Sequence, residues 1–287
     1  MSLSRRTVTK ASIALLCAVS LSGCVNFGGA AKFKREVQLV VESAGTPAQL
    51  DVSSRNGKID VFAGSHATFT GNTTDTIVID AVIKARTQER ADATQISAKT
   101  NAEGVLEVRT VWPDGRALNS EGTSYVINMA QCDGAKIHSS NGSLRAFGTS
   151  GMILLDSSNG SIRVEDHAGD VNADTSNGSV KLIRVSGRAN ADTSNGSIEI
   201  VLTPDNPGPL HADSSNGSVS ITVGPAFVGT LKCNTSNGRV NPNISSSTDT
   251  TWNSLSKTSG ALIIGNPEPV SIVKTSNSSI TINVEND

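Results

Sequence analysis

The middle of the chain reads SSNGSIRV at residues 157–164, TSNGSVKL at residues 175–182, TSNGSIEI at residues 193–200 and SSNGSVSI at residues 214–221. Weaker copies precede and follow these four. A nearly constant period of about 20 residues indicates a stacked-repeat architecture. The asparagines shared by the six clearest copies, with one from an earlier copy, are Asn56, Asn141, Asn159, Asn177, Asn195, Asn216 and Asn237.

Each repeat contains two stretches in which apolar and polar residues alternate. Ile162 and Val164 follow Asn159 at the third and fifth positions, and Ala173 and Val171 precede Asn177 at the fourth and sixth. Alternation of this kind predicts a β-strand with one buried face. Asn and Gly accommodate positive φ, so an Asn-Gly pair and a second glycine suit the corners between strands. We therefore expect two short strands and two corners in every repeat.

Two assemblies fit these repeats. In a β-solenoid each repeat is one coil of about 18–21 residues, and equivalent residues stack in parallel register. In an antiparallel meander each Asn-Gly would be a hairpin turn. We favour the all-β solenoid, because stacking asparagine on asparagine gives every repeat a reason to keep the same polar block. Periodicity by itself leaves the meander open.

The flanking regions are predicted to extend the stack. A strand is expected over residues 36–41 and a first coil over residues 48–61, followed by an excursion with strands near residues 76–85, 94–99, 104–112 and 123–129. This excursion should continue or cover the N-terminal end of the stack, because an open rung exposes unpaired backbone groups. Two imperfect final coils are predicted at residues 258–263 and 275–282.

Residues 1–23 are predicted to be a lipoprotein signal peptide. Arg5, Arg6 and Lys10 form a positive region, residues 11–21 are apolar, and LSGC at residues 21–24 matches a lipobox. Cys24 would carry the lipid, and residues 24–34 would form a tether to a single domain at 35–287. The general secretory and twin-arginine routes both stay open. An Asp after the lipidated cysteine would retain a lipoprotein at the inner membrane, and Val25 stands there instead, so the outer membrane or the cell surface is the expected destination.

The order of these features resembles the bacterial "putative adhesin" β-strand-repeat family, whose function is unknown. The resemblance covers residues 36–284: a leading strand, one Asn-Gly coil, a strand-rich excursion and serial repeats. It implies a right-handed β-helix on an exported or surface-anchored protein. It brings no catalytic residues with it. Gly260 and Ala261 stand where Asn-Gly is expected, which departs from the motif.

Nothing in the composition or the motifs points to catalysis or nucleic-acid binding. The chain carries a net charge of −2 without a basic patch, and it includes only six Phe, one Tyr and two Trp. The four histidines fall in different columns of the repeat and are not expected to form a zinc site. Cys132 and Cys233 should lie about 24 Å apart, five rungs of the stack, too far for a disulfide.

One outward column is acidic. Four aspartates stand three positions before successive asparagines: Asp156, Asp174, Asp192 and Asp213. Stacked carboxylates about 4.8 Å apart repel one another by roughly 1 kcal/mol per pair in water. We favour a solvated acidic stripe, and weak calcium binding is the alternative.

These features together predict a lipid-anchored cell-envelope protein that acts by binding, adhesion or scaffolding and is not an enzyme. The membrane is its partner through the lipid, and the ligand is expected to be an envelope glycan or a surface protein. Two alternatives are an envelope polysaccharide-modifying β-helix enzyme and a periplasmic structural or sensor lipoprotein.

Overall fold

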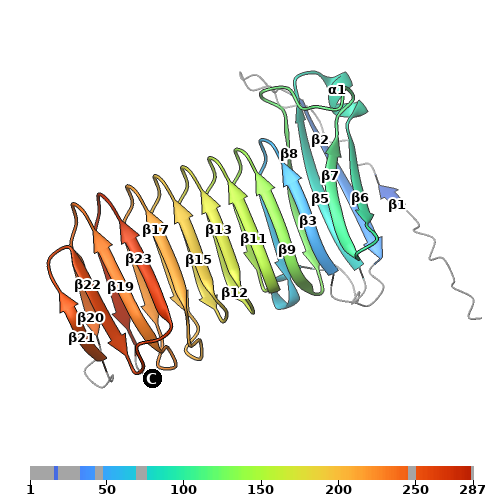
Figure 1. The fold of residues 1–287 in the computed structure, drawn as a ribbon. Helices are drawn as coiled ribbons and strands as arrows, with labels where there is room; N and C mark the ends of the chain where they lie inside the picture. The colour runs from blue at the N-terminus through green and yellow to red at the C-terminus, as the bar shows by residue number, and fades with distance from the viewer. Residues whose placement is uncertain (1–15, 19–32, 43–47, 69–75, 245–249, 286–287) are drawn as a thin grey trace, which may run out of the picture.

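A computed structural model describes residues 16–18, 33–42, 48–68, 76–244 and 250–285. They form an elongated all-β stack of two long sheets (Figure 1). Most of the predicted signal peptide, Cys24 and the tether lie outside the described residues. Within the described ranges, no helix has the length and apolar character needed to cross a membrane.

The two sheets contain twelve strands each. Sheet A runs in the order β1 (Leu16–Ala18), β2 (Phe33–Glu42), β5 (Thr76–Ala85), β8 (Gly122–Met129), β4 (Ile59–Ala63), β10 (Leu144–Phe147), β12 (Ile162–His167), β14 (Val180–Val185), β16 (Ile198–Leu202), β18 (Val219–Val223), β24 (Ile280–Val284), β20 (Val240–Ile244). Sheet B runs in the order β21 (Thr250–Leu255), β22 (Ser259–Ile264), β19 (Gly229–Thr235), β23 (Val270–Thr275), β17 (Leu210–Ser214), β15 (Ala189–Thr193), β13 (Val171–Thr175), β11 (Ser150–Ser157), β9 (Cys132–Ser139), β3 (Ala48–Ser54), β7 (Val105–Val111), β6 (Gln95–Thr100).

Each regular repeat gives one strand to each sheet, and equivalent strands pair in parallel. In sheet A, Ile162 pairs with Val180 and Val180 with Ile198, so one period of the sequence becomes one rung of the stack. These three side chains are at most 1% exposed and lie in the core between the sheets. The stacked, parallel arrangement is therefore confirmed for these repeats, and the antiparallel meander is wrong for them.

The four-residue block recurs from coil to coil because each position has its own contact. The first Ser or Thr is buried and donates to a glycine carbonyl one coil earlier, as Thr175 Oγ1 does to Gly160 O at 2.9 Å. The asparagine side chains form a ladder in which each Nδ2 donates to the Oδ1 of a neighbouring rung at 2.6–2.8 Å. The ladder runs Asn56, Asn141, Asn159, Asn177, Asn195, Asn216, Asn277, Asn237.

The C-terminal coils do not stack in chain order. The coil formed by β23 and β24 lies between the coil of β17 and β18 and the coil of β19 and β20. Asn277 therefore enters the ladder between Asn216 and Asn237, which the sequence predicted to be neighbours. The predicted coil at residues 258–263 is also wrong: β22 pairs antiparallel with β19, and β21 pairs antiparallel with β22.

The N-terminal excursion continues both sheets, as predicted. In sheet A, β8 pairs parallel with β4, and β5 pairs antiparallel with β8 and with the leading strand β2. In sheet B, β7 pairs parallel with β3 and antiparallel with β6. The helix α1 (Gln88–Ala93) was not predicted; Thr87 caps it by accepting a hydrogen bond from Arg90 N. A single 3-10 turn, η1 (Gly64–His66), follows β4. The excursion lies at one end of the stack in Figure 1, with α1 beside the ends of its strands.

Candidate functional site

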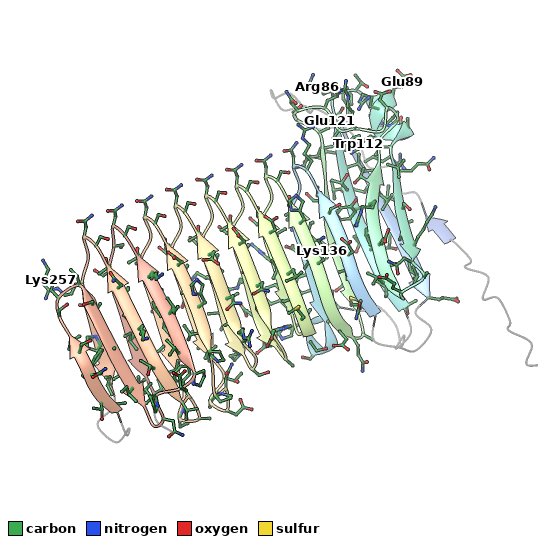
Figure 2. All side chains as sticks on the ribbon, viewed as in Figure 1. Arg86, Glu89, Trp112, Glu121, Lys136 and Lys257 are labelled. Atoms are coloured by element: carbon green, nitrogen blue, oxygen red, sulfur yellow. The ribbon has the colours of Figure 1, made fainter. Side chains whose placement is uncertain are left out.

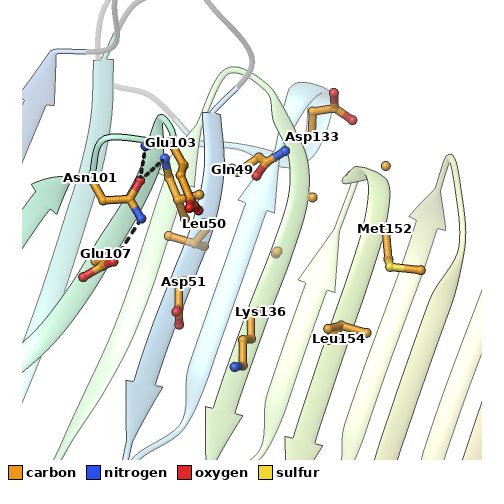
Figure 3. Close-up of a pocket in the computed structure, with 14 residues that line it drawn as sticks. Gln49, Leu50, Asp51, Asn101, Glu103, Glu107, Asp133, Lys136, Met152 and Leu154 are labelled. Carbon is orange, nitrogen blue, oxygen red and sulfur yellow. Dashed lines mark hydrogen bonds between the residues drawn. The ribbon is translucent and has the colours of Figure 1, made fainter.

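A groove of about 570 Å³ lies on the outer face of sheet B, where the first coils meet the N-terminal excursion. It crosses β7, β3, β9 and β11, and Figure 3 shows its labelled side chains on these neighbouring strands. Its lining combines apolar, amide and charged groups. The lining residues are Gln49, Leu50, Asp51, Asn101, Glu103, Val105, Glu107, Asp133, Gly134, Ala135, Lys136, Gly151, Met152 and Leu154.

Two successive β-bulges shape the groove. The pairing of β9 with β3 shifts before Ala135, and the pairing of β11 with β9 shifts before Ile153. Gly134 and Gly151 occupy these bulges with φ of +97° and +73°, which side chains rarely adopt. Gly134 also leaves the space between Gln49 and the Met152 backbone without a side chain. The sequence shows this only as a corner glycine displaced by one position, at Gly134 instead of residue 133.

The end of the groove on β11 is apolar and open. Met152 is 56% exposed and Leu154 is 39% exposed, both on the outer face of the sheet. Side chains alternate between the two faces along β11, so Met152 and Leu154 both point outward while Ile153 and Leu155 are buried. Two adjacent exposed apolar side chains in a hollow form a small contact surface for a ligand.

The opposite end is acidic and is held by its own hydrogen bonds. Asn101 Oδ1 accepts from Glu103 N and Val105 N, both at 3.0 Å, and Asn101 Nδ2 donates to Glu107 Oε1 at 3.1 Å (Figure 3). Arg109 forms an ion pair of 2.8 Å with Asp51. Among the described residues, Glu103 and Lys136 form no ion pair. Both charges are therefore available to a ligand.

The acidic column is assembled as predicted, but basic groups flank it. Asp156, Asp174, Asp192 and Asp213 are in register on successive strands. His138 lies 3.3 Å from Asp156 at one end, and the inserted coil places Lys274 beside Asp213 at the other. Burial raises the pKa of Asp192; His211 opposes this shift, and the charges of Asp174 and Asp213 add to it.

The column also forms a mixed cluster that sequence spacing did not reveal. His211 pairs with Asn190 of the neighbouring strand, so it lies in the outward column two residues before the aspartates. Its Nε2 lies 3.6 Å from Asp192 Oδ1. One ligand atom each from Asp192, His211 and Asp213 falls within 4.8 Å of the others. Among the described residues, His211 is thus the one histidine in a cluster that could hold a metal ion, and the four histidines do not come together.

If the acidic column binds calcium, the alternative to a solvated stripe, millimolar calcium should raise the melting temperature of the protein slightly. Carboxylates on adjacent rungs supply the oxygen ligands that calcium prefers, and unfolding separates them. The increase should shrink in an Asp174→Asn/Asp192→Asn variant, measured by thermal melts with and without calcium. Equal melting of the wild type in both conditions would leave only a solvated acidic stripe.

A second cluster joins the outer corners of three coils on the sheet A side. His66 Nε2 lies 2.8 Å from Asp166 Oδ2, and Arg184 Nη2 donates to the same oxygen at 2.9 Å. Hydrogen bonds from Arg184 lower the pKa of Asp166, with its charge and His66 adding to the effect. Nearby, Phe62 and Phe147 stack with ring centroids 5.1 Å apart. These groups satisfy one another, so we assign the cluster a structural role.

The remaining perturbed groups are buried and have structural surroundings. Burial raises the pKa of the Cys132 and Cys233 thiols to about 12, so both stay protonated and unreactive near neutral pH. Both cysteines are free, and six strand intervals separate β19 from β9, one more than the five predicted, because β23 is inserted next to β19. Burial lowers the pKa of His167, whose ring nitrogens contact Thr149 Oγ1 at 2.9 Å and Gly151 O at 3.0 Å. None of these three side chains lines the groove.

Comparison with known proteins yields one family match and several distant structures. Residues 136–286 match a family described as a domain of unknown function, DUF7330. No curated protein matches the chain.

Three solved structures are similar at low identity. A "putative cell adhesion protein" from Clostridium sporogenes is 14% identical, with 88% of this chain and 100% of that chain covered and a TM-score of 0.30. A "putative adhesin" from Bacteroides fragilis is 12% identical over 86% and 97% of the two chains, with a TM-score of 0.41. Another "putative adhesin", from Parabacteroides distasonis, is 9% identical over 88% and 97%, also with a TM-score of 0.41.

Proposed function

This chain belongs to the DUF7330 family, whose function is unknown, and on that premise we propose that it is an exported, lipid-anchored protein that binds a ligand at the bacterial cell envelope without catalysis. The stack is a right-handed β-helix in this proposal, because crossovers between parallel strands are right-handed in nearly all proteins. The lipid on Cys24 would hold the stack at the membrane, in the outer membrane or at the cell surface.

The observation that carries the binding role is the groove on sheet B. It presents exposed Met152 and Leu154 beside the charges of Glu103 and Lys136, on strands that are rigidly paired to both sides. A preformed hollow on a rigid scaffold loses little conformational entropy when it binds, which favours recognition. The perturbed pKa values of His167, Cys132 and Cys233, in contrast, belong to buried side chains that do not line the groove.

We expect the full chain, displayed on lipid vesicles, to bind cells or an envelope-glycan array through this groove. A Met152→Asp/Leu154→Asp variant should lose that binding, because it places charge on the apolar surface. Leu255→Asp is the matched control, since Leu255 is 50% exposed on β21, away from the groove. Equal binding by all three proteins would overturn the assignment to the groove. Turnover of an envelope glycan would instead favour the enzyme alternative.

We expect Cys24→Ser to release the protein from membranes. A single acyl chain anchors a protein only marginally, whereas two or more chains on one cysteine anchor it stably. Fractionation of cells that express each form, with detection of the protein in the soluble and membrane fractions, measures the effect. Ser22→Ala, which leaves the cysteine in place, is the control. Membrane retention of the Cys24→Ser protein would remove lipid anchoring from the proposal.

A further inference from the structure

We propose that the groove recognises an extended peptide that carries a basic side chain and an apolar side chain about four residues apart. This proposal rests on the binding function above and names its ligand class. It follows from charge, from the order of side chains along the stack and from the spacing of the strands.

Charge decides the class of side chain at one end. Four carboxylates line the groove, from Asp51, Glu103, Glu107 and Asp133, against the single ammonium of Lys136. Arg109 neutralises Asp51 by its ion pair of 2.8 Å. Three carboxylates then remain against one ammonium: Glu103 and Glu107 at the acidic end, and Asp133 beside the start of β11, where Ser150 Oγ lies 3.4 Å from Asp133 Oδ1. A cationic side chain complements this lining, and an anionic one is repelled by it.

Glu103 and Glu107 are the groups best placed to receive the cation. Asn101 closes the turn between β6 and β7 through two backbone N–H groups and also donates to Glu107. The turn therefore fixes the Glu103 backbone and holds the Glu107 carboxylate on one side of the groove before any ligand arrives. A guanidinium or ammonium there gains charge-assisted hydrogen bonds with little reorganisation of the protein.

The register orders the rest of the site along the stack. Glu107 pairs with Asp51, Asp51 with Lys136, and Lys136 with Leu154, so four strands carry one row of outward side chains. This row begins with a carboxylate and ends at the apolar pair of Leu154 and Met152. Lys136 stands between them (Figure 2 and Figure 3) and can donate to the carbonyl groups of a bound backbone.

The strand spacing fixes the spacing of the ligand. Glu107 and Leu154 are three strand intervals apart, about 14 Å at about 4.8 Å per interval. An extended chain advances about 3.4 Å per residue, so it covers this distance in about four residues. A peptide lying across the strands would thus place its basic residue on Glu103 and Glu107 and its apolar residue on Met152 and Leu154.

The test uses the full chain in detergent micelles and fluorescein-labelled peptides read by anisotropy. The probe has the sequence Gly-Arg-Gly-Gly-Gly-Leu-Gly, and Gly-Glu-Gly-Gly-Gly-Leu-Gly is the charge control. We expect binding of the arginine peptide alone, weakened by salt. A Glu103→Gln/Glu107→Gln variant should bind it about tenfold more weakly, the loss typical of a charge-assisted hydrogen bond.

The matched control is Asp174→Asn/Asp192→Asn, which makes the same change of charge on the same face but outside the groove. It should bind the arginine peptide as the wild type does. An equal loss in both variants would mean a non-specific acidic surface, and equal or absent binding of the two peptides would overturn the ligand class. Envelope binding that is lost in Met152→Asp/Leu154→Asp, without peptide binding, would reject this proposal and leave the proposed function standing.

Discussion

Replacing Gly196 by alanine should destabilise the stack by about 3 kcal/mol or more, at or beyond the upper end of the usual cost of overpacking. A Cβ at Gly196 would lie 1.9 Å from the carbonyl oxygen of Gly178 and 2.4 Å from its carbonyl carbon, in the coil below. Both are backbone atoms, so no side-chain rotation relieves the clash. The corner would have to lift, which breaks the 2.8 Å hydrogen bond from Asn195 to Asn177.

Thermal or denaturant melts of Gly196→Ala measure this cost. A loss of about 3 kcal/mol corresponds to a fall of about 6–12 °C in the melting temperature of a domain of this size. Ser278→Ala is the matched control, because Ser278 occupies the same column in the inserted coil and already carries a Cβ. Similar melting of the two variants would show that the corner column tolerates side chains and that close approach does not explain its glycines.

Replacing Glu121 by alanine should cost about 3–5 kcal/mol, the usual range for breaking a buried ion pair at one partner. The Glu121 side chain is fully buried and accepts four hydrogen bonds of 2.9–3.0 Å, two from Arg90 and one each from Leu118 N and Arg86 N. Figure 2 places Glu121 among Arg86 and Trp112 in the N-terminal excursion. Its carbonyl oxygen also accepts from Asn56 Nδ2 at 2.7 Å, which ties this cluster to the first rung of the ladder.

Because of the Glu121 carboxylate, we expect the stability of the folded protein to fall in acid. Burial alone would raise the pKa of this carboxylate, but hydrogen bonds from Arg90, Leu118 and Arg86 outweigh burial and lower the pKa to about 2. The unfolded value is about 4.3, so the unfolded chain takes up a proton first as the pH falls. The stabilisation by Glu121 is therefore complete above about pH 4.3 and is lost as the pH falls toward 2.

Denaturant melts of wild type and Glu121→Gln across pH 2–7 test this dependence. The difference in unfolding free energy between them should be largest near neutral pH and should narrow in acid. The double variant Glu121→Leu/Arg90→Leu should lose less stability than Glu121→Leu, because Arg90 in the single variant has lost its buried partner and keeps only the exposed carboxylate of Asp114. A difference that stays constant with pH would contradict a Glu121 carboxylate that is ionised in the folded protein.

Local repetition is what the sequence by itself determined. The alternation around Asn159 or Asn177 specifies a strand with one buried face, whatever its neighbours are. Within the block from Thr175 to Gly178, Thr175 supplies a buried hydroxyl donor, Asn177 a side-chain amide for the asparagine ladder, and Gly178 a corner residue that has no Cβ. These features depend only on residues close together in the sequence, so the strands of the repeats and of the N-terminal excursion were predictable. Equivalent columns, including the aspartates, then follow from stacking alone.

Tertiary structure decided where nonadjacent segments meet. Asn277 makes the same side-chain hydrogen bonds in the asparagine ladder as its neighbours do. The repeat pattern therefore does not determine whether its coil lies before or after the coil of Asn237. In the structure it lies before, and β22 pairs antiparallel with the other edge of β19. His66 meets Asp166 from a distant part of the chain. The groove, too, depends on bulges that shift the register at Gly134 and Gly151. The repeat determines which side chains of a strand face the core and which face solvent. It does not determine which strand lies next to it, because similar coils pair with one another at nearly equal energy.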